Sequence, residues 1–376
     1  MPVEPVATVT AGAWADDATM TLRLADPDHA LAGVRLQQDL GIAADLLDFR
    51  REGAGWELTL DRPPVARMEY LLELHSHDGG TDVVPDPANP RQVAGAFGPK
   101  SVLEFPGYAA PGWLAESADP GGSTTFAVRA PSLDAAVGVR IWAPGGARGD
   151  EPLPLLVVHD GPEYDSLASL TQYLGAGIAG GWLPRLRAAL LSPGQVGPGQ
   201  LGSGQLGSGQ LSPGHRNDWY SASAGYARAL MTQVIPAVTG GVASTVRIGM
   251  GTSLGGLAML HAHCRYPGLF GGLFLQSGSF FVPRLDSQER RFPYYRRITA
   301  FTASLRAHGV PGDPVPVVMT CGSIEENIGN NRLMLAVLRS AGYPATLHEV
   351  PDVHNYTAWR DAFDPYLTEL VAAVTR

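Results

Sequence analysis

A serine between glycines is the first residue of this chain that could do chemistry. Residues 251–255 read Gly-Thr-Ser-Leu-Gly, a G-x-S-x-G motif centred on Ser253. The apolar run 246–250 predicts a buried strand before the motif, and 254–266 predicts a helix after it. This order is the context of a nucleophile elbow, a turn too tight for side chains beside the serine. The N–H of Leu254, at the N-terminus of the helix, could donate to a developing oxyanion.

The base that would activate Ser253 is predicted to be His354. A serine nucleophile needs a base, and the base needs an acid that orients it. Of the five histidines after Ser253, four are predicted to lie in helices or strands, namely His261, His263, His308 and His348. His354 instead lies in a predicted loop between a strand at 346–350 and a helix at 357–374, which is where the base of such an enzyme belongs.

The acid is expected after the preceding strand, which is predicted at 315–320. The segment 321–327 contains two adjacent carboxylates, and these cannot both point inward. Glu325 is the first choice and Glu326 stays open as the alternative. Asp352 is too close in sequence to His354 for the usual geometry of the pair.

A second oxyanion donor should come from the loop after the buried strand predicted at 153–158. The next residues, 159–164, read His-Asp-Gly-Pro-Glu-Tyr. Because Pro162 has no N–H, the donor must be Gly161 or Glu163.

The surrounding pattern predicts an α/β fold. Residues 1–110 show short alternating strands with frequent turns, which is typical of a small β-sandwich. From 111 to 376, strands alternate with helices, which indicates a mostly parallel sheet covered by helices on both faces. Further strands are predicted at 124–130, 137–143, 187–191 and 273–276, and further helices at 222–238, 295–308 and 327–341. An insertion at 192–214 begins with four copies of a five-residue unit rich in Gly, Ser, Pro and Gln, and it predicts a mobile surface loop, with a lid as the alternative.

Composition limits the classes of partner. The chain of 376 residues carries a formal net charge of −9 and has no Lys/Arg run, which argues against nucleic acid and anionic membranes. Cys264 and Cys321 form no metal-binding pattern, so neither a metal nor another cofactor is expected. The N-terminus does not resemble a signal peptide and no apolar run approaches a membrane span, so a cytoplasmic protein is expected. The oligomeric state stays open.

These motifs resemble the enterochelin (enterobactin) esterase family of α/β-hydrolases, a group of related esterases that includes feruloyl esterases and mycolyltransferases. The matching segments are 159–161, 216–220, 251–256, 276–280, 321–327, and His354 followed by 359–360. An N-terminal β-sandwich ahead of the hydrolase domain also fits, whereas Pro162 departs from relatives that take an oxyanion N–H from that position. The resemblance implies an α/β-hydrolase fold and the hydrolysis of siderophore or aromatic-acyl esters.

The expected activity is therefore that of a serine carboxylester hydrolase that works through an acyl-enzyme on a small-molecule ester. Arg216, with other arginines at 284, 290, 291, 296 and 297, could supply a basic pocket for an anionic substrate. Trp219, Tyr220 and Phe280 could wall an aromatic acyl pocket. An acyltransferase would use the same triad with another acceptor. A non-catalytic binding protein would typically have lost Ser253 or His354.

Overall fold

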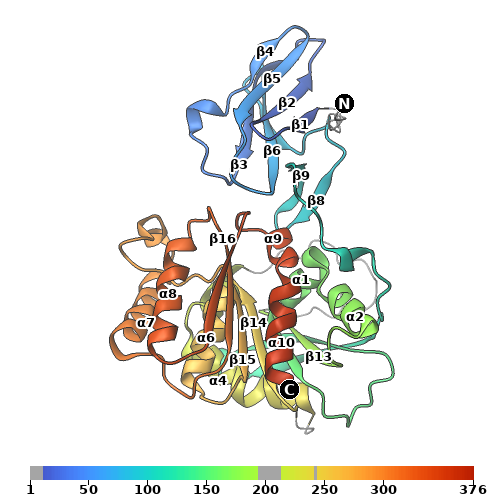
Figure 1. The fold of residues 1–376 in the computed structure, drawn as a ribbon. Helices are drawn as coiled ribbons and strands as arrows, with labels where there is room; N and C mark the ends of the chain where they lie inside the picture. The colour runs from blue at the N-terminus through green and yellow to red at the C-terminus, as the bar shows by residue number, and fades with distance from the viewer. Residues whose placement is uncertain (1–11, 194–212, 241–243) are drawn as a thin grey trace, which may run out of the picture. The chain divides into compact units, whose positions relative to one another are not determined.

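The structure, a computed structural model, describes residues 12–193, 213–240 and 244–376 (Figure 1). The predicted repeat loop therefore lies almost wholly outside the described residues. The chain divides into two compact units. The N-terminal unit comprises Met1–Ala110 with two short later segments, Gly322–Glu325 and Pro351–Asn355. The C-terminal unit comprises the rest, which is Pro111–Cys321, Glu326–Val350 and Tyr356–Arg376.

The N-terminal unit consists of two sheets that share one core. One sheet has the strand order β1-β2-β5-β4 and the other β3-β6-β9-β8, with β7 also paired to β6. The strands are β1 (Ala13–Ala15), β2 (Thr19–Ala25), β3 (Leu31–Gln38), β4 (Arg50–Glu52), β5 (Gly55–Asp61), β6 (Arg67–Ser76), β7 (Thr81–Val84), β8 (Gln92–Gly95) and β9 (Gly98–Glu104). Met20 and Leu22 from β2 and Leu72 from β6 are buried in the same cluster, so the predicted sandwich-like domain is confirmed.

An eight-stranded sheet organises the C-terminal unit, in the order β10-β11-β13-β12-β14-β15-β16-β17. These strands are β10 (Gly122–Ala130), β11 (Ala135–Ala143), β12 (Leu155–His159), β13 (Arg187–Ser192), β14 (Arg247–Thr252), β15 (Gly272–Gln276), β16 (Val317–Gly322) and β17 (Ala345–Val350). Pairing is antiparallel from β10 to β13 and parallel from β13 through β12, β14 and β15 to β16. The predicted α/β fold with a mostly parallel sheet is confirmed.

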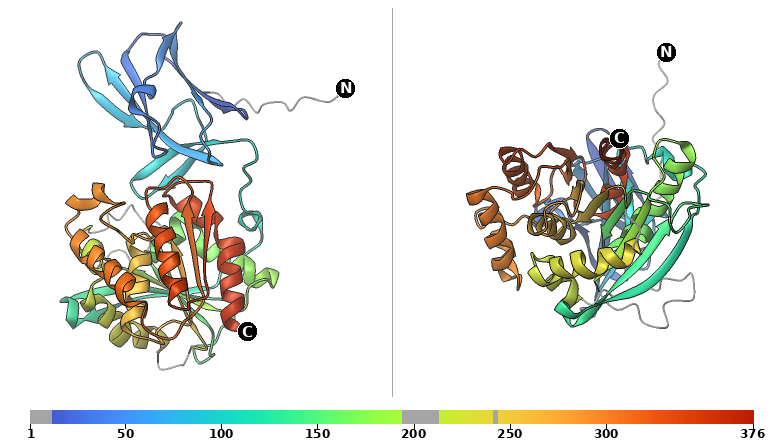
Figure 2. Two further views of the ribbon diagram at one scale, coloured as in Figure 1. Left: turned by 60° about the vertical axis from the view of Figure 1, so that its left-hand side comes forward. Right: turned by 90° about the horizontal axis from the view of Figure 1, so that it is seen from below.

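Helices cover both faces of this sheet, whose central strands bury apolar side chains on both sides. In β12, Leu155 and Val157 point into one buried cluster and Leu156 and Val158 into the other, as the two-residue period of a strand requires. On the first face lie α3 (Pro213–Tyr220), α4 (Ala224–Ala229), α5 (Ile235–Thr239), α6 (Leu254–Arg265), α7 (Tyr295–His308) and α8 (Ile328–Ser340). On the second face lie α1 (Gly161–Ala168), α2 (Leu170–Gly180), α9 (Tyr356–Asp361) and α10 (Thr368–Thr375) (Figure 2).

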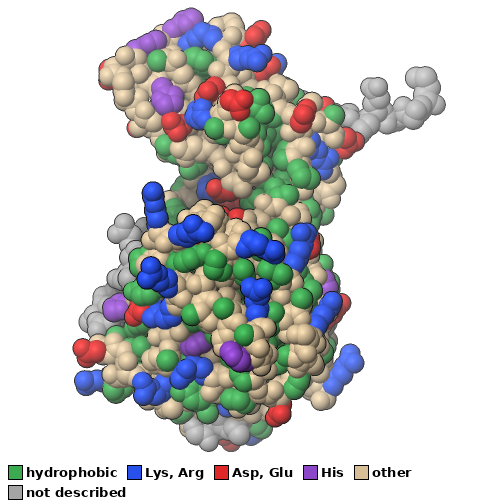
Figure 3. Space-filling model, turned by 90° about the vertical axis from the view of Figure 1, so that its left-hand side faces the viewer, with side chains coloured by type: hydrophobic (Ala, Val, Ile, Leu, Met, Phe, Trp, Pro, Cys, Tyr) green, Lys and Arg blue, Asp and Glu red, His purple; other side chains and the backbone are tan. Residues whose placement is uncertain are grey.

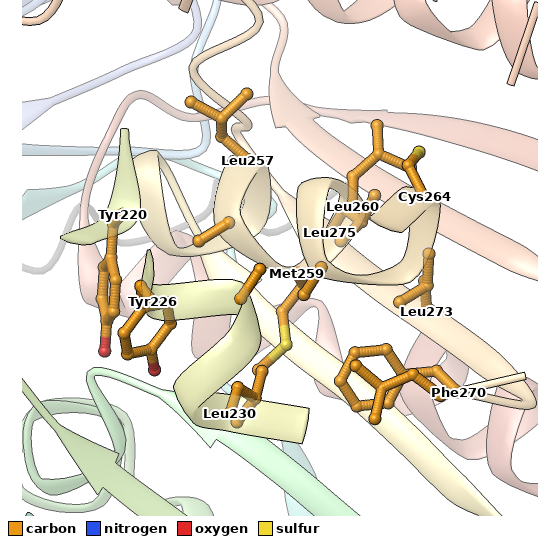
Figure 4. Close-up of a cluster of buried hydrophobic side chains, with 14 of the residues drawn as sticks. Tyr220, Tyr226, Leu230, Leu257, Met259, Leu260, Cys264, Phe270, Leu273 and Leu275 are labelled. Carbon is orange, nitrogen blue, oxygen red and sulfur yellow. The ribbon is translucent and has the colours of Figure 1, made fainter. Parts of the chain in front are cut away.

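Helix α6 packs along the first face with side chains on nearly all sides buried. Leu257, Met259 and Leu260 of α6 and Leu273 and Leu275 of β15 belong to one buried cluster (Figure 4). Each of these side chains is less than 1% exposed. Full burial of such side chains is worth roughly 1.5–3 kcal/mol each, so the cluster fixes the helix that begins next to Ser253.

Two predicted helices differ from the observed elements. The helix predicted at 222–238 is divided by a π-helical segment, Leu230–Val234, between α4 and α5. The helix predicted at 357–374 is interrupted at Asp364, which has φ −109° and ψ 124°. Pro365 explains this break, because proline lacks an N–H and disfavours helical geometry in the residue before it. The residues after Asp160 were expected to form a loop, but they form α1 from Gly161 onward.

Candidate active site

Ser253 occupies a strained turn between β14 and α6. Its backbone has φ 53° and ψ −124°, a conformation that non-glycine residues rarely adopt. The turn is held by backbone bonds on both sides: the N–H of Ser253 donates to the carbonyl of Gln276 at 2.9 Å, and the N–H of Leu257 donates to the carbonyl of Ser253 at 3.1 Å. A positive φ at a half-buried serine between a strand and a helix is the geometry of a nucleophile elbow.

The glycines around Ser253 are required by close backbone contacts. A Cβ on Gly251 would lie 2.5 Å from the carbonyl carbon of Gly255. A Cβ on Gly255 would lie 3.1 Å from Cβ of His159 and 3.3 Å from Oδ2 of Asp160. The motif therefore has a steric cause, because side chains at these positions would force β14, α6 and the end of β12 apart.

Two backbone N–H groups are available for an oxyanion near this turn. Leu254 and Gly161 each begin a helix, so their N–H groups have no partner within it, and neither has another acceptor among the described residues. The two helix N-termini adjoin each other, because Nδ1 of His159 lies 2.9 Å from the carbonyl oxygen of Gly255. The N–H of Glu163 instead interacts with its own carboxylate, which leaves Gly161 as the freer of the two predicted alternatives.

Arg216 is paired with a buried aspartate. Its Nε and Nη2 lie 2.9 and 2.6 Å from the two carboxylate oxygens of Asp160, which forms a bidentate pair. The Asp160 side chain is 1% exposed and that of Arg216 is 19% exposed. Asp160 directly precedes α1, so this ion pair braces the segment that carries the N–H of Gly161.

The three predicted aromatic contacts lie in the core of the C-terminal unit. Trp219 is 2% exposed, and Tyr220 and Phe280 are 0% exposed. Tyr220 stacks on the ring of His159, with centroids 4.3 Å apart. Burial lowers the pKa of His159 to about 4, so this imidazole is neutral in the folded protein. Tyr220 thus packs against a ring that in turn contacts the carbonyl of Gly255 in α6, and the role of the three aromatic side chains as walls of an acyl pocket stays a prediction.

Ser279 is a neighbour of the serine that the sequence reasoning did not single out. Its Oγ lies 3.1 Å from Oγ of Ser253, and its N–H donates to the carbonyl of Ser253 at 3.1 Å. Ser279 lies in the segment 276–280 that carried part of the family resemblance, but no spacing rule pointed to the residue itself.

Glu325 and His354 form a hydrogen-bonded pair in the N-terminal unit. Nδ1 of His354 lies 2.9 Å from Oε2 of Glu325, and the N–H of Gly322 donates to Oε1 of Glu325 at 2.8 Å. The Glu325 side chain is 1% exposed, whereas that of His354 is 36% exposed. Glu326 is exposed and makes no such hydrogen bond with any residue that the structure describes. Because a carboxylate only accepts, Nδ1 of His354 carries the proton and Nε2 is left as the basic atom.

Comparison with known proteins identifies the family. A family described as "Putative esterase" matches residues 130–370, well over half of the chain. The chain belongs to this esterase family. As a member, the protein is a carboxylic ester hydrolase. Comparison with curated proteins by sequence gives no match.

The likeness in fold to solved structures extends beyond the residues that the family match covers. It is similar to ferric enterobactin esterase from Salmonella typhimurium, with 19% identity, a TM-score of 0.77, and 97% of this chain and 98% of that chain covered. It is also similar to enterochelin esterase from Shigella flexneri, with 19% identity, a TM-score of 0.75, and 98% and 97% covered. The expected α/β-hydrolase fold with an N-terminal β-domain is thus confirmed over nearly the whole chain.

The described part of the esterase contains no cluster of three or more His, Cys, Asp or Glu side chains that could hold a metal ion. In the same residues, none of the helices has both the length and the apolar character needed to cross a membrane.

Glu163 is a second acidic side chain at the start of α1. Burial, and then the nearby charge of Asp160, raise the pKa of Glu163 to about 7 from its ordinary 4.5. Its Oε2 is buried without a hydrogen-bond partner among the described residues. The carboxyl group is therefore largely protonated in mildly acidic solution, and it ionises within the range in which esterases are assayed.

Replacing Glu163 with glutamine should change how stability depends on pH. Between pH 4.5 and 7 the folded protein holds a proton at Glu163 that the unfolded chain has lost, so the free energy of unfolding falls as pH rises through this window. From pH 5 to pH 8, wild type should lose on the order of 2 kcal/mol more than Glu163→Gln in urea unfolding. Glu369→Gln, at an exposed position, should follow wild type, and parallel curves for wild type and Glu163→Gln would refute the assignment.

Proposed function

We propose that this esterase is a serine hydrolase in which Ser253 is the nucleophile, His354 the general base and Glu325 the orienting acid. The observation that carries the proposal is the backbone of Ser253, which is held at φ 53° between a buried strand and a helix N-terminus. The hydrogen bond between Glu325 and His354 supports the other two roles.

The proposed reaction proceeds through an acyl-enzyme. Oγ of Ser253 attacks the ester carbonyl while Nε2 of His354 takes its proton, and the N–H groups of Leu254 and Gly161 bind the oxyanion. The intermediate collapses, and the leaving alcohol receives the proton from His354. His354 then takes a proton from a water that attacks the acyl carbonyl. As this second intermediate collapses, His354 returns the proton to Oγ of Ser253, which releases the carboxylic acid and restores both residues. Throughout, Glu325 holds the ring of His354 and stabilises its imidazolium form.

We further propose that the substrate is an anionic aromatic ester of the catecholate or aromatic-acyl class. Similar structures include the enterobactin esterase from Shigella flexneri in the presence of enterobactin. Arg284, Arg290, Arg291 and Arg296 lie after β15, where they are exposed and make no ion pair within the described residues. Figure 3 views the C-terminal unit from the side of α7 and α8, where basic side chains are spread over the surface. In a chain of net charge −9, these arginines are a local positive region that would attract an anionic substrate.

The nucleophile is tested by labelling and substitution. An organophosphonate should label Ser253 stoichiometrically, as located by peptide mass spectrometry. Ser253→Ala should reduce kcat on an aryl ester by roughly 10⁴-fold or more, because no attacking oxygen remains. Ser340→Ala, at an exposed helix position, is the control and should behave as wild type. A label on another residue, or full activity in Ser253→Ala, would overturn the proposal.

The two adjacent glutamates give a matched test of the acid. Glu325→Gln preserves shape but exchanges one acceptor oxygen for a donor beside Nδ1 of His354, so kcat should fall by about 10²–10⁴-fold. Glu326→Gln alters an exposed carboxylate and should keep kcat within about threefold, as expected for surface changes. Steady-state kinetics on one ester compares them. The reverse order would give the role to Glu326, and small equal effects would indicate a Ser–His dyad.

The substrate class is tested with a double variant, Arg290→Gln with Arg296→Gln, and a single control variant in α7. Arg296 lies in the first turn of α7 and Arg306 in its last turn. Arg296→Gln, combined with Arg290→Gln, should raise KM severalfold for an anionic catecholate ester and leave KM for a neutral aryl ester unchanged. Arg306→Gln should alter neither. Equal effects on both esters, or KM for the anionic ester independent of salt, would exclude recognition by charge.

A further inference from the structure

Arg67 is a buried arginine whose partners lie far away in the sequence. It begins β6 in the N-terminal unit and is 1% exposed. Its Nη1 lies 2.9 Å from Oε1 of Glu69 on the same strand, and its Nε lies 3.0 Å from Oδ2 of Asp352. Its Nη2 donates to Oδ1 of Asn355. Three nitrogens of one guanidinium thus engage three side chains, two of which flank His354.

The loop that carries His354 is fixed on both sides of the histidine. Oδ1 of Asp352 accepts the N–H of Val353 at 2.7 Å and Nδ2 of Asn355 at 2.9 Å, so the two partners of Arg67 also hold each other. Next to Arg67, the N–H of Ala66 donates to the carbonyl of Pro351 at 2.7 Å. Burial raises the pKa of Asp352 to about 6, although the nearby charge of Arg67 acts in the opposite direction. At pH 8 this buried carboxylate is therefore charged, and Arg67 balances its charge.

The loop that carries Glu325 is held in the same unit. Ile324 packs against the apolar core of the β-sheets. Gly322 has no room for a side chain, because a Cβ there would collide with the carbonyl oxygen of Asp352 and would lie 2.8 Å from Cγ of Glu325. The pair formed by Glu325 and His354 is therefore built onto the N-terminal β-structure, with Arg67 as its charged anchor.

We propose that Arg67 is a positioning residue that sets the ring of His354 against Glu325, so that turnover depends on the N-terminal β-unit. This inference rests on the proposed role of His354 as base. The planar guanidinium has fixed donor directions and can hold several acceptors in one arrangement, which the single ammonium of lysine cannot reproduce. Displacement of a catalytic group by about 1 Å can cost on the order of 10²-fold in rate.

The test compares two buried aspartates of the same unit. Asp352 is 6% exposed and pairs with Arg67, and Asp26 is 5% exposed and pairs with Arg51, away from the His354 loop. At pH 8, Asp352→Asn should lower kcat by about 30-fold or more, with KM within threefold. Proton NMR should also show a shift or loss of the downfield Nδ1–H resonance of His354, which is assigned by its absence in His354→Ala. Asp26→Asn should keep both the resonance and kcat. Equal effects of the two variants, or an unchanged resonance in Asp352→Asn, would refute the positioning role.

Arg67→Lys is the second variant, because it keeps the positive charge but replaces the planar guanidinium and its several fixed donors. It should fold, as judged by circular dichroism, and reproduce the kinetic and NMR changes of Asp352→Asn. Wild-type kcat together with a wild-type resonance in Arg67→Lys would refute the proposal. The resonance does not depend on turnover, so it tests Arg67 separately from the proposed function. Full activity in His354→Ala would instead show that the proposed base is wrong.

Discussion

The end of β14 and the start of α6 lie in close contact, and the positions of Ser253 and of the helix N-terminus beside it depend on that closeness. Gly251 and Gly255 allow the strand and the helix to meet, and buried apolar contacts on both faces of the sheet keep them there. The strain at Ser253 persists because the surrounding structure determines it. The contact between His159 and the carbonyl of Gly255 places the start of α1 near the start of α6, so two backbone N–H groups without an acceptor among the described residues begin neighbouring helices.

Buried ion pairs hold the segments that the sheet alone does not fix. Asp160 and Arg216 brace the residue before Gly161, and Arg67 and Asp352 brace the loop of His354. Losing one member of such a pair typically costs about 3–5 kcal/mol, because the other charge is left buried without a partner. Each pair thus penalises movement of a backbone segment that would contribute to catalysis. Both pairs join residues distant in sequence, so they couple local geometry to the fold.

Local patterns were enough to predict the strand, the turn and the helix around Ser253. Apolar runs indicate buried elements, and the glycines indicate positions where a side chain would not fit. They also predicted Glu325 ahead of Glu326, but only the fold shows which carboxylate meets His354. Arg67 could not be found in this way, because its partner Asn355 is 288 residues further along the chain. The break at Asp364 was missed because the apolar period continues across Pro365. The burial of the aromatic residues of α3 could not be predicted, since sequence alone does not distinguish a pocket wall from the core behind it, and their role as pocket walls stays a prediction.

The proposed mechanism requires Ser253, His354 and Glu325 to act together in one reaction, with the N–H groups of Leu254 and Gly161 as oxyanion donors. A crystal structure of the esterase after reaction with an aryl phosphonate tests it most directly. Phosphorus should be bonded to Oγ of Ser253, with the phosphoryl oxygen about 2.7–3.1 Å from the backbone nitrogens of Leu254 and Gly161. Nε2 of His354 should lie within hydrogen-bond distance of Oγ. A phosphoryl oxygen that points away from both N–H groups, or His354 remote from the adduct, would contradict the proposed mechanism.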